Sequence, residues 1–353
     1  MRQARKQMPQ PEAMALLAAA PVHELAAVLP GGRPLLRHLH GAALDGDLVF
    51  HCALAGEKAA AAGGPAVAGA AEVVAEIPST FRNGPGCTAT TWYRSALAEG
   101  RLEWVDDPGR KARALDALMA KHQPEGGWAP LDPDAPDGAR TLAGVGVLAL
   151  RPERVTGKRE LGQGLKDSER RRVLTCLWGR GRPADLRAVD ASLAAFPLDV
   201  PPDFLSAPSG ARLLCAPGPD RLDEALGLLE DAYWLEDVTP AAVRRAHRLS
   251  GAWVGALAAE TGELVATARA AGDGARQEWL FDIVVRPDWR GRGLGRALVR
   301  LILDHPRLRG CASIGLATRD AQDFYAAFGF RVRDAAVAAT RRGEIMVRDR
   351  GGG

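Results

Sequence analysis

The sequence has few cysteines, no block of like charges and no long apolar run. Its 353 residues include five cysteines, odd in number and widely spaced, with no C-x-x-C pair and no histidine nearby at zinc-ligand spacing. This pattern predicts reduced thiols and no metal site. No uninterrupted apolar run reaches membrane length. We therefore expect a cytoplasmic protein without a membrane partner.

The sequence also has no large excess of positive or negative charge. The formal net charge is +3, and no block of five or more like charges interrupts the chain. Such a balance gives no electrostatic footprint for a polyanion, and no helix-turn-helix with a basic recognition helix is present. We predict no nucleic-acid partner, which argues against a DNA-binding regulator.

Two structured blocks flank a segment rich in proline and small residues. The length favours two domains, and prolines at 197, 201, 202 and 208 break the periodicity between the blocks. The sequence predicts a first domain over 1–197, a linker over 198–210 and a second domain over 211–353.

A glycine-rich loop in the second block joins an apolar strand at 279–285 to a one-faced helix that begins at Leu294. Gly291, Gly293 and Gly295 therefore lie at a helix N-terminus. Backbone N–H groups there have no partner within the helix, and the helix dipole favours negative charge. The loop predicts a pyrophosphate site. A Rossmann site is the competing interpretation, but its glycines follow the first strand of the domain.

The spacing Arg290-x-x-Gly293-x-Gly295 resembles the acetyl-CoA loop of the GNAT acetyltransferases, and 321–330 resembles that family's last helix and aromatic strand entry. The resemblance covers 211–348 and implies an α+β fold with a mixed central sheet and acetyl-CoA as a substrate. It also implies that the backbone of Ile283, Val284 and Val285 holds the pantetheine arm. The implied pyrophosphate contacts are Arg290, Gly291, Arg292, Gly293, Leu294 and Gly295.

The same resemblance implies that the Tyr325 hydroxyl protonates the departing CoA sulfur; the alternative is an aromatic core residue beside Phe324 and Phe328. Strand alternation places Glu278 and Asp282 on one face of the 279–285 strand. Both are candidate catalytic acids. Asp282 could accept the amine proton, directly or through water, or bind a cationic substrate, and its alternative role is purely structural.

The first block has short strands separated by tight turns and one amphipathic helix at 109–122, a β-barrel pattern. The segments 33–58 and 90–102 resemble the FMN-binding split barrel of the pyridoxamine-phosphate-oxidase-like superfamily. The likeness extends to its nitroimidazole-reductase-like branch and, through the tail at 155–174, to its FMN-binding negative transcriptional regulators. It implies FMN as a cofactor and a homodimer through the barrel. The implied FMN contacts are Lys58, His51, Arg37, Arg94 and Ser95.

Each FMN contact also has a structural explanation. Lys58 could be a solvated turn residue, His51 a hydrogen-bonded strand histidine, and Arg94 a partner of Asp106. The tail at 158–164 departs from the family pattern, so the barrel could also serve only as a scaffold.

Together these features predict an N-acetyltransferase that acts on a primary amine of a small molecule or peptide, fused to an FMN-binding barrel. Two alternatives remain open. One is a flavin-dependent reductase or oxidase with a CoA-binding regulatory domain. The other is a regulatory protein that senses FMN or acetyl-CoA.

Overall fold

The computed structural model describes residues 4–333, 339–340 and 343–349. Contacts divide the chain into two compact units, one of Met1–Glu76 with Thr91–Leu161 and one of Ile77–Thr90 with Gly162–Gly353. Residues 162–197 thus make their contacts with the second unit. The limits of the two folding domains predicted from the sequence, 1–197 and 211–353, stay a prediction. Within the described residues, no helix has both the length and the apolar character needed to cross a membrane.

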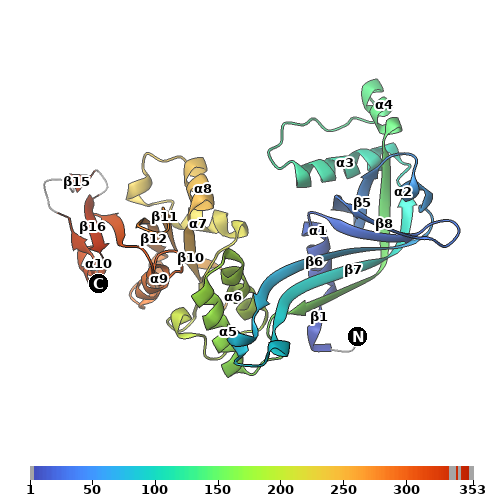
Figure 1. Ribbon diagram of the computed structural model, residues 1–353. Coiled ribbons are helices and arrows are strands. Elements are labelled where there is room, and N and C mark those ends of the chain that lie inside the picture. The colour runs from blue at the N-terminus through green and yellow to red at the C-terminus, as the bar shows by residue number, and fades with distance from the viewer. Residues whose placement is uncertain (1–3, 334–338, 341–342, 350–353) are drawn as a thin grey trace. The chain divides into compact units, whose positions relative to one another are not determined.

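The first unit is a strongly bent antiparallel sheet with the strand order β3-β2-β6-β7-β8-β5-β4, and β1 also pairs with β8 (Figure 1). One side of the bend encloses an apolar core that includes Leu25, Phe50 and Leu148. The elements are β1 (Gln7–Met8), α1 (Gln10–Ala19), β2 (His23–Val28), β3 (Pro34–Leu39), β4 (Gly41–Leu44), β5 (Asp47–Cys52), α2 (Glu57–Ala60), β6 (Pro65–Ile77), β7 (Thr90–Trp104), α3 (Pro108–His122), α4 (Pro136–Gly144) and β8 (Gly146–Glu160).

Two helices show how local sequence sets this unit. Helix α3 begins where Asp107 accepts a hydrogen bond from the backbone N–H of Arg110 at 2.7 Å, a side-chain cap. Helix α1 buries Ala13 and Leu17 completely in the core. The sequence pattern predicts α3 but not α1, because α1 is apolar on most of its surface and has no clear periodicity.

The second unit is a mixed sheet with the strand order β14-β16-β13-β12-β11-β10-β9, and β15 also pairs with β16 (Figure 1). The β12–β13 pair is parallel and its neighbours are antiparallel. The elements are α5 (Asp167–Arg180), α6 (Pro183–Ala195), β9 (Ala211–Leu214), α7 (Leu222–Leu228), α8 (Pro240–Leu249), β10 (Ala252–Ala258), β11 (Leu264–Gly272), β12 (Gln277–Val285), α9 (Leu294–Leu303), β13 (Ser313–Thr318), α10 (Gln322–Ala326), β14 (Arg331–Val332), β15 (Ala339–Thr340) and β16 (Gly343–Asp349).

Strands β12 and β13 separate after a short paired stretch. Their described pairing covers only residues 277–279 of β12 with 313–315 of β13. From Leu280 onward, β12 pairs with β11 alone. The hydrogen-bonding edge of β12 that faces β13 is therefore open over 280–285.

Both predicted fold classes are confirmed. The first unit is a curled antiparallel half-barrel with helices, as expected for a split barrel. The second has the order β-α-α-β-β-β-loop-α-β-α-β and a mixed sheet, as expected for the GNAT fold.

Candidate functional site

The glycine-rich loop enters helix α9 through left-handed backbone. Gly291 and Gly293 have φ of 72° and 86°, and Gly293 is the N-cap of α9. A Cβ placed on Gly293 would meet no atom within 4 Å, so open space lies in front of the helix N-terminus. The backbone N–H groups of the first turn face this space without intrahelical partners. This geometry suits a diphosphate.

Arginines surround the loop. Arg290 Nε donates to the backbone oxygen of Val285 at 3.0 Å. The guanidinium of Arg292 lies 5.1 Å from the ring centroid of Trp289, and that of Arg296 lies 5.9 Å from the ring of Phe324. These contacts hold positive charge on both sides of the helix N-terminus without neutralising it.

A cavity of about 720 Å³ adjoins the loop and includes the last residues of β12. Its walls come from β12, the segment after it, α7 and the segment that follows α7. The predicted acetyl-CoA residues among its walls are Ile283, Val284, Val285 and Arg290.

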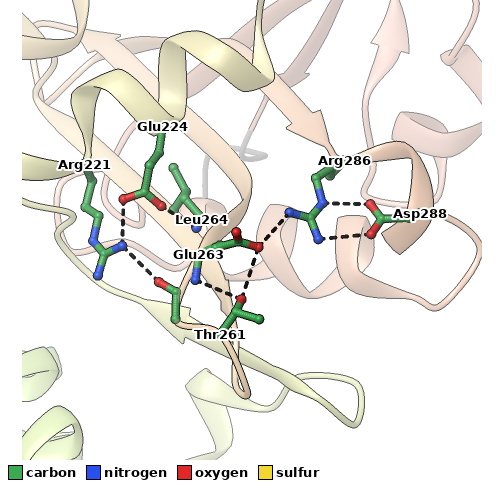
Figure 2. Close-up of polar contacts among 8 residues, drawn as sticks. Arg221, Glu224, Thr261, Glu263, Leu264, Arg286 and Asp288 are labelled. Carbon is green, nitrogen blue, oxygen red and sulfur yellow. Dashed lines mark hydrogen bonds and ion pairs between the residues drawn. The ribbon is translucent and has the colours of Figure 1, made fainter.

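One wall of this cavity is fixed by a polar network (Figure 2). Glu224 accepts hydrogen bonds from Arg221 and from the backbone N–H of Leu264, both at 2.7 Å. Arg286 bridges Glu263, at 3.2 Å, and Asp288, at 2.8 Å. The network ties α7, the β10–β11 turn and the segment before α9 together, so the cavity keeps its shape at this wall.

Tyr325 lies on α10 and is 8% exposed. Its ring packs edge-on against Phe324, and the Phe324 ring lies within 4 Å of the Cβ position of Gly295. Burial raises the pKa of Tyr325 well above its usual value, with smaller contributions from nearby Tyr233 and Asp320. Tyr233 and Asp320 line the cavity, whereas the buried ring of Tyr325 does not.

Asp282 occupies a bulge in β12, with φ of 52°. Its two oxygens are both engaged: Oδ2 accepts from Arg269 Nε at 2.5 Å and Oδ1 accepts from Trp234 Nε1 at 3.1 Å. Trp234 lines the cavity, whereas Asp282 lies behind it. This arrangement fits a carboxylate that positions Trp234 better than one that takes up a proton directly.

Glu278 is on the same face of β12 as Asp282, as predicted, but four residues away, or about 13 Å along the strand. It is fully buried and accepts from Arg307 Nε at 2.7 Å. Glu278 does not line the cavity beside the loop. The structure therefore does not bring Glu278 together with Tyr325 and the glycine loop.

In the first unit, Lys58 on α2 is half-buried and His51 on β5 is exposed. Arg37 on β3 forms an ion pair with Glu57, which also pairs with Arg33. The hydrogen bond from Arg33 holds the pKa of Glu57 below its usual value. The charge of Arg37 is thus largely compensated, and Lys58 remains the stronger candidate for a phosphate.

Arg94 and Ser95 lie on a different part of the bent sheet within one chain. Arg94 is opposite Arg159 on β8, whereas His51 is opposite Val147. These two positions of β8 are twelve residues apart, which corresponds to about 40 Å of path along the strand. The partner of Arg94 is Glu72, at 4.0 Å, and not the Asp106 considered from the sequence.

Four cavity residues with a part in the site are not among those predicted from the sequence: Asp231, Tyr233, Trp234 and Asp320. Tyr233 accepts a hydrogen bond from the backbone N–H of Arg319 at 3.0 Å, Trp234 donates to Asp282, and Asp320 is exposed. Tyr233 and Trp234 follow α7 in a short 3-10 turn, and neither belongs to a motif that could have marked it.

The second unit has the GNAT fold with a glycine-rich loop at the start of α9, and the first unit has the split-barrel fold. Comparison with protein families agrees. The family described as pyridoxamine 5'-phosphate oxidase matches residues 9–159, and the acetyltransferase (GNAT) family matches residues 221–330.

Three relatives illustrate the likeness. Serotonin N-acetyltransferase 2, chloroplastic, of Oryza sativa subsp. japonica is 38% identical over 90 residues, which are 25% of this chain and 43% of that protein. The chain thus spans less than half of that curated relative. A putative GNAT-family acetyltransferase from Xanthomonas campestris pv. campestris is 32% identical, with 39% of this chain and 94% of that chain covered and a TM-score of 0.34. A putative 5-nitroimidazole antibiotic resistance protein from Bacteroides thetaiotaomicron is 17% identical, with coverages of 43% and 86% and a TM-score of 0.36.

The chain therefore carries a pyridoxamine 5'-phosphate oxidase-like domain over 9–159 and a GNAT acetyltransferase domain over 221–330.

Proposed function

We propose that this protein transfers an acetyl group from acetyl-CoA to a primary amine of a small molecule or peptide. One observation carries the proposal: a cavity of about 720 Å³ is lined both by Ile283, Val284 and Val285 on the open edge of β12 and by Arg290 of the glycine-rich loop that leads into α9. An extended pantetheine arm would hydrogen-bond to the open edge through Ile283, Val284 and Val285. The pyrophosphate would contact Arg290 and the backbone of 291–295.

The chemistry needs one proton acceptor and one proton donor. The amine nitrogen attacks the thioester carbonyl carbon, the new C–N bond forms as the C–S bond breaks, and the thiolate leaves. The Tyr325 hydroxyl gives its proton to this sulfur, and the phenolate that remains takes up, through water, the proton that the acylated nitrogen loses to become a neutral amide. Burial raises the pKa of this phenol, so Tyr325 is protonated before the reaction and its phenolate regains a proton readily afterwards.

The acceptor amine would enter past Asp231 and Asp320. Both are exposed cavity residues, and neither forms an ion pair among the described residues. Their carboxylates would attract an ammonium group, and a water at the cavity mouth would carry its proton to solvent before attack. Asp282 would act by holding Trp234 in place, and Glu278 takes no step in this scheme.

For the first unit we propose FMN binding in a homodimer. Lys58 and His51 would hold the phosphate and flavin edge in one chain, while Arg94 and Ser95 would contribute to the site from the other chain. Exposed apolar side chains on the bent sheet, among them Leu36, Val73 and Leu97, supply surface for such a dimer.

The test is an acetyl-transfer assay in which released CoA thiol is measured with serotonin, spermidine and a lysine peptide as acceptors. Serotonin is included because the rice relative carries that substrate in its name. We expect thiol release above the no-amine control with at least one amine. Absence of both turnover and acetyl-CoA binding would contradict the proposal.

A further inference from the structure

The second unit has another cavity, of about 590 Å³, far from the glycine loop. We call it the α6–α8 pocket. It lies among the start of α6, the end of α8, the start of β10 and the segment after α9. Helices α5 and α6, at 167–195, lie outside both matched family ranges, which end at 159 and begin at 221. Part of this pocket is therefore built from a segment that neither family accounts for.

Helices α5 and α6 are held firmly against the acetyltransferase fold. Trp178 on α5 donates from Nε1 to Asp304 Oδ2 at 2.6 Å and stacks on Phe204 with the ring centroids 4.8 Å apart. Asp190 on α6 accepts hydrogen bonds from the backbone N–H groups of Cys215 and Ala216, at 2.9 and 2.8 Å. The walls of the pocket are thus fixed relative to one another.

The charge of the pocket has one sign. Arg180, Arg187, Arg248 and Arg307 line it, and none of its lining residues is Asp or Glu. Arg180 is committed to Asp185 and Arg307 to Glu278. Arg187 and Arg248 are exposed and form no ion pair within the part of the chain that the structure describes. Two guanidinium groups therefore remain available for an anion.

A buried imidazole in the pocket wall lacks one hydrogen-bond partner. His247 is 3% exposed, and its Nδ1 lies 3.0 Å from the backbone oxygen of Val243. Because a carbonyl oxygen only accepts, Nδ1 carries the proton and Nε2 of the neutral ring is an acceptor. Nε2 has no partner among the described residues, although it is buried. A buried acceptor without a donor is unfavourable, so a ligand hydroxyl or N–H would satisfy it.

The pocket also has an apolar wall. The ring of Trp253 packs edge-on against His247, with the centroids 5.3 Å apart, and Trp253 Nε1 is already bonded to Thr267 Oγ1 at 2.9 Å. Its indole thus offers a flat surface with no unmet polar group. A volume of this order suits a small ligand with an aromatic or apolar body.

We propose that the α6–α8 pocket binds a small organic anion. Arg187 and Arg248 would hold its carboxylate or phosphate, Trp253 its apolar body, and His247 Nε2 a hydroxyl or N–H. The site is separate from the acetyl-CoA cavity. Arg307 in its wall pairs with Glu278 near the start of β12, about 23 Å along the strand from Val285 at the loop end.

The experiment is calorimetric titration of the full-length protein with two probes, AMP for a phosphate and salicylate for a carboxylate. Saturating CoA is present so that the loop site is blocked. We expect one site per chain for at least one probe. Replacement of both Arg187→Glu and Arg248→Glu should weaken that binding by about tenfold or more, because two charge-assisted contacts become repulsive.

The matched control is Arg245→Glu. Arg245 is an exposed arginine on the same helix, α8, that does not line the pocket. It should change the affinity by no more than about twofold, the size of a screened long-range effect. In spectra with ¹⁵N-labelled histidine, the Nε2 resonance of His247 should shift on binding. Failure of both probes to bind, an unchanged affinity in the double variant, or an equal loss in Arg245→Glu would overturn the proposal. None of these readouts requires acetyl transfer, so they stand apart from the test of the proposed activity.

Discussion

The predicted cofactor residues of the second unit run almost consecutively from Ile283 to Gly295, whereas those of the first unit lie on four different elements: β3, β5, α2 and β7. In the second unit, short-range geometry alone brings the predicted residues together, because a strand end, a turn and a helix start follow one another along the chain. In the first unit, the distances between the predicted FMN contacts depend on how a long bent sheet is folded. Within one chain that sheet separates Arg94 from His51 by about 40 Å of strand. A consecutive motif thus specifies a site directly, and a scattered one specifies it only together with the fold or a second copy.

The largest expected effect concerns the consecutive motif. Gly293→Asp should weaken acetyl-CoA binding by about 100-fold or more, because it places a carboxylate against the phosphates at the start of α9. Binding is measured by calorimetry. Gly46→Asp is the matched control, since Gly46 has the same φ of 86° and open space at its Cβ position, but lies in the first unit. Equal losses in both variants would mean that backbone strain, and not the loop, is responsible.

Tyr325→Phe should lower kcat by about 100-fold, the usual contribution of a general acid, with little change in acetyl-CoA affinity. Tyr93→Phe, in the first unit, should leave both unchanged. The assay is thiol release under saturating substrates. Turnover of the Tyr325 variant at the wild-type rate would remove its assigned role and leave it as an aromatic core residue.

The predicted FMN contacts of the first unit, which lie on four different elements, lead to a different prediction. If two chains share each site, Lys58→Ala and Arg94→Ala should each weaken FMN binding by about tenfold. This is the loss expected for one charge-assisted hydrogen bond. Flavin fluorescence titration gives the affinity, and native mass spectrometry gives the number of chains. Arg140→Ala, at an exposed position of α4, is the control. Losses in both variants of a protein that is monomeric with FMN bound would contradict the shared site.

The smallest effect is on stability, where two groups of the second unit titrate with opposite sign. Burial raises the pKa of Asp190 to about 6, so its contribution is lost as the pH rises from about 4 to 6. Burial, helped by Arg309 and Arg307, lowers the pKa of His305 to about 4, so its contribution is lost as the pH falls from about 6.5 to 4. The two slopes oppose each other in wild-type protein.

Urea unfolding between pH 4 and 6.5 tests this compensation. Asp190→Asn should make the unfolding free energy rise more steeply with pH than in wild type, and His305→Gln should make it fall. Each difference is expected to be about 2 to 3 kcal/mol across this range. Parallel pH profiles for all three proteins would show that these groups do not titrate as described.

The sequence predicted both fold classes through element order and motif resemblance, and spacing correctly placed Gly293 at the start of a helix. The role of this loop as an acetyl-CoA site stays a prediction. Alternation also placed Glu278 and Asp282 correctly on one face of β12. It could not show that Asp282 is held by Trp234, 48 residues earlier, or that Glu278 pairs with Arg307, 29 residues later. Such pairs depend on which strands and helices become neighbours.

Helices α5 and α6 show the same limit at a larger scale. The sequence resemblance treats 167–174 as the tail of the barrel, but Trp178 and Asp190 make their contacts with the acetyltransferase fold. Neither residue belongs to a motif. Their partners lie after the proline-rich segment, so no pattern confined to the first block could reveal them.

Because β12 and β13 separate, the edge of β12 at 280–285, in the middle of the sheet of the second unit, has no neighbouring strand among the described residues. In the complex we propose, the pantetheine arm is the missing strand, and the cofactor becomes a piece of the sheet as well as a reagent. Every turnover then takes apart and rebuilds an internal strand. Those amide protons of 280–285 that point away from β11 should accordingly exchange with solvent at a rate set by cofactor occupancy, while those that point toward β11 keep their protection throughout.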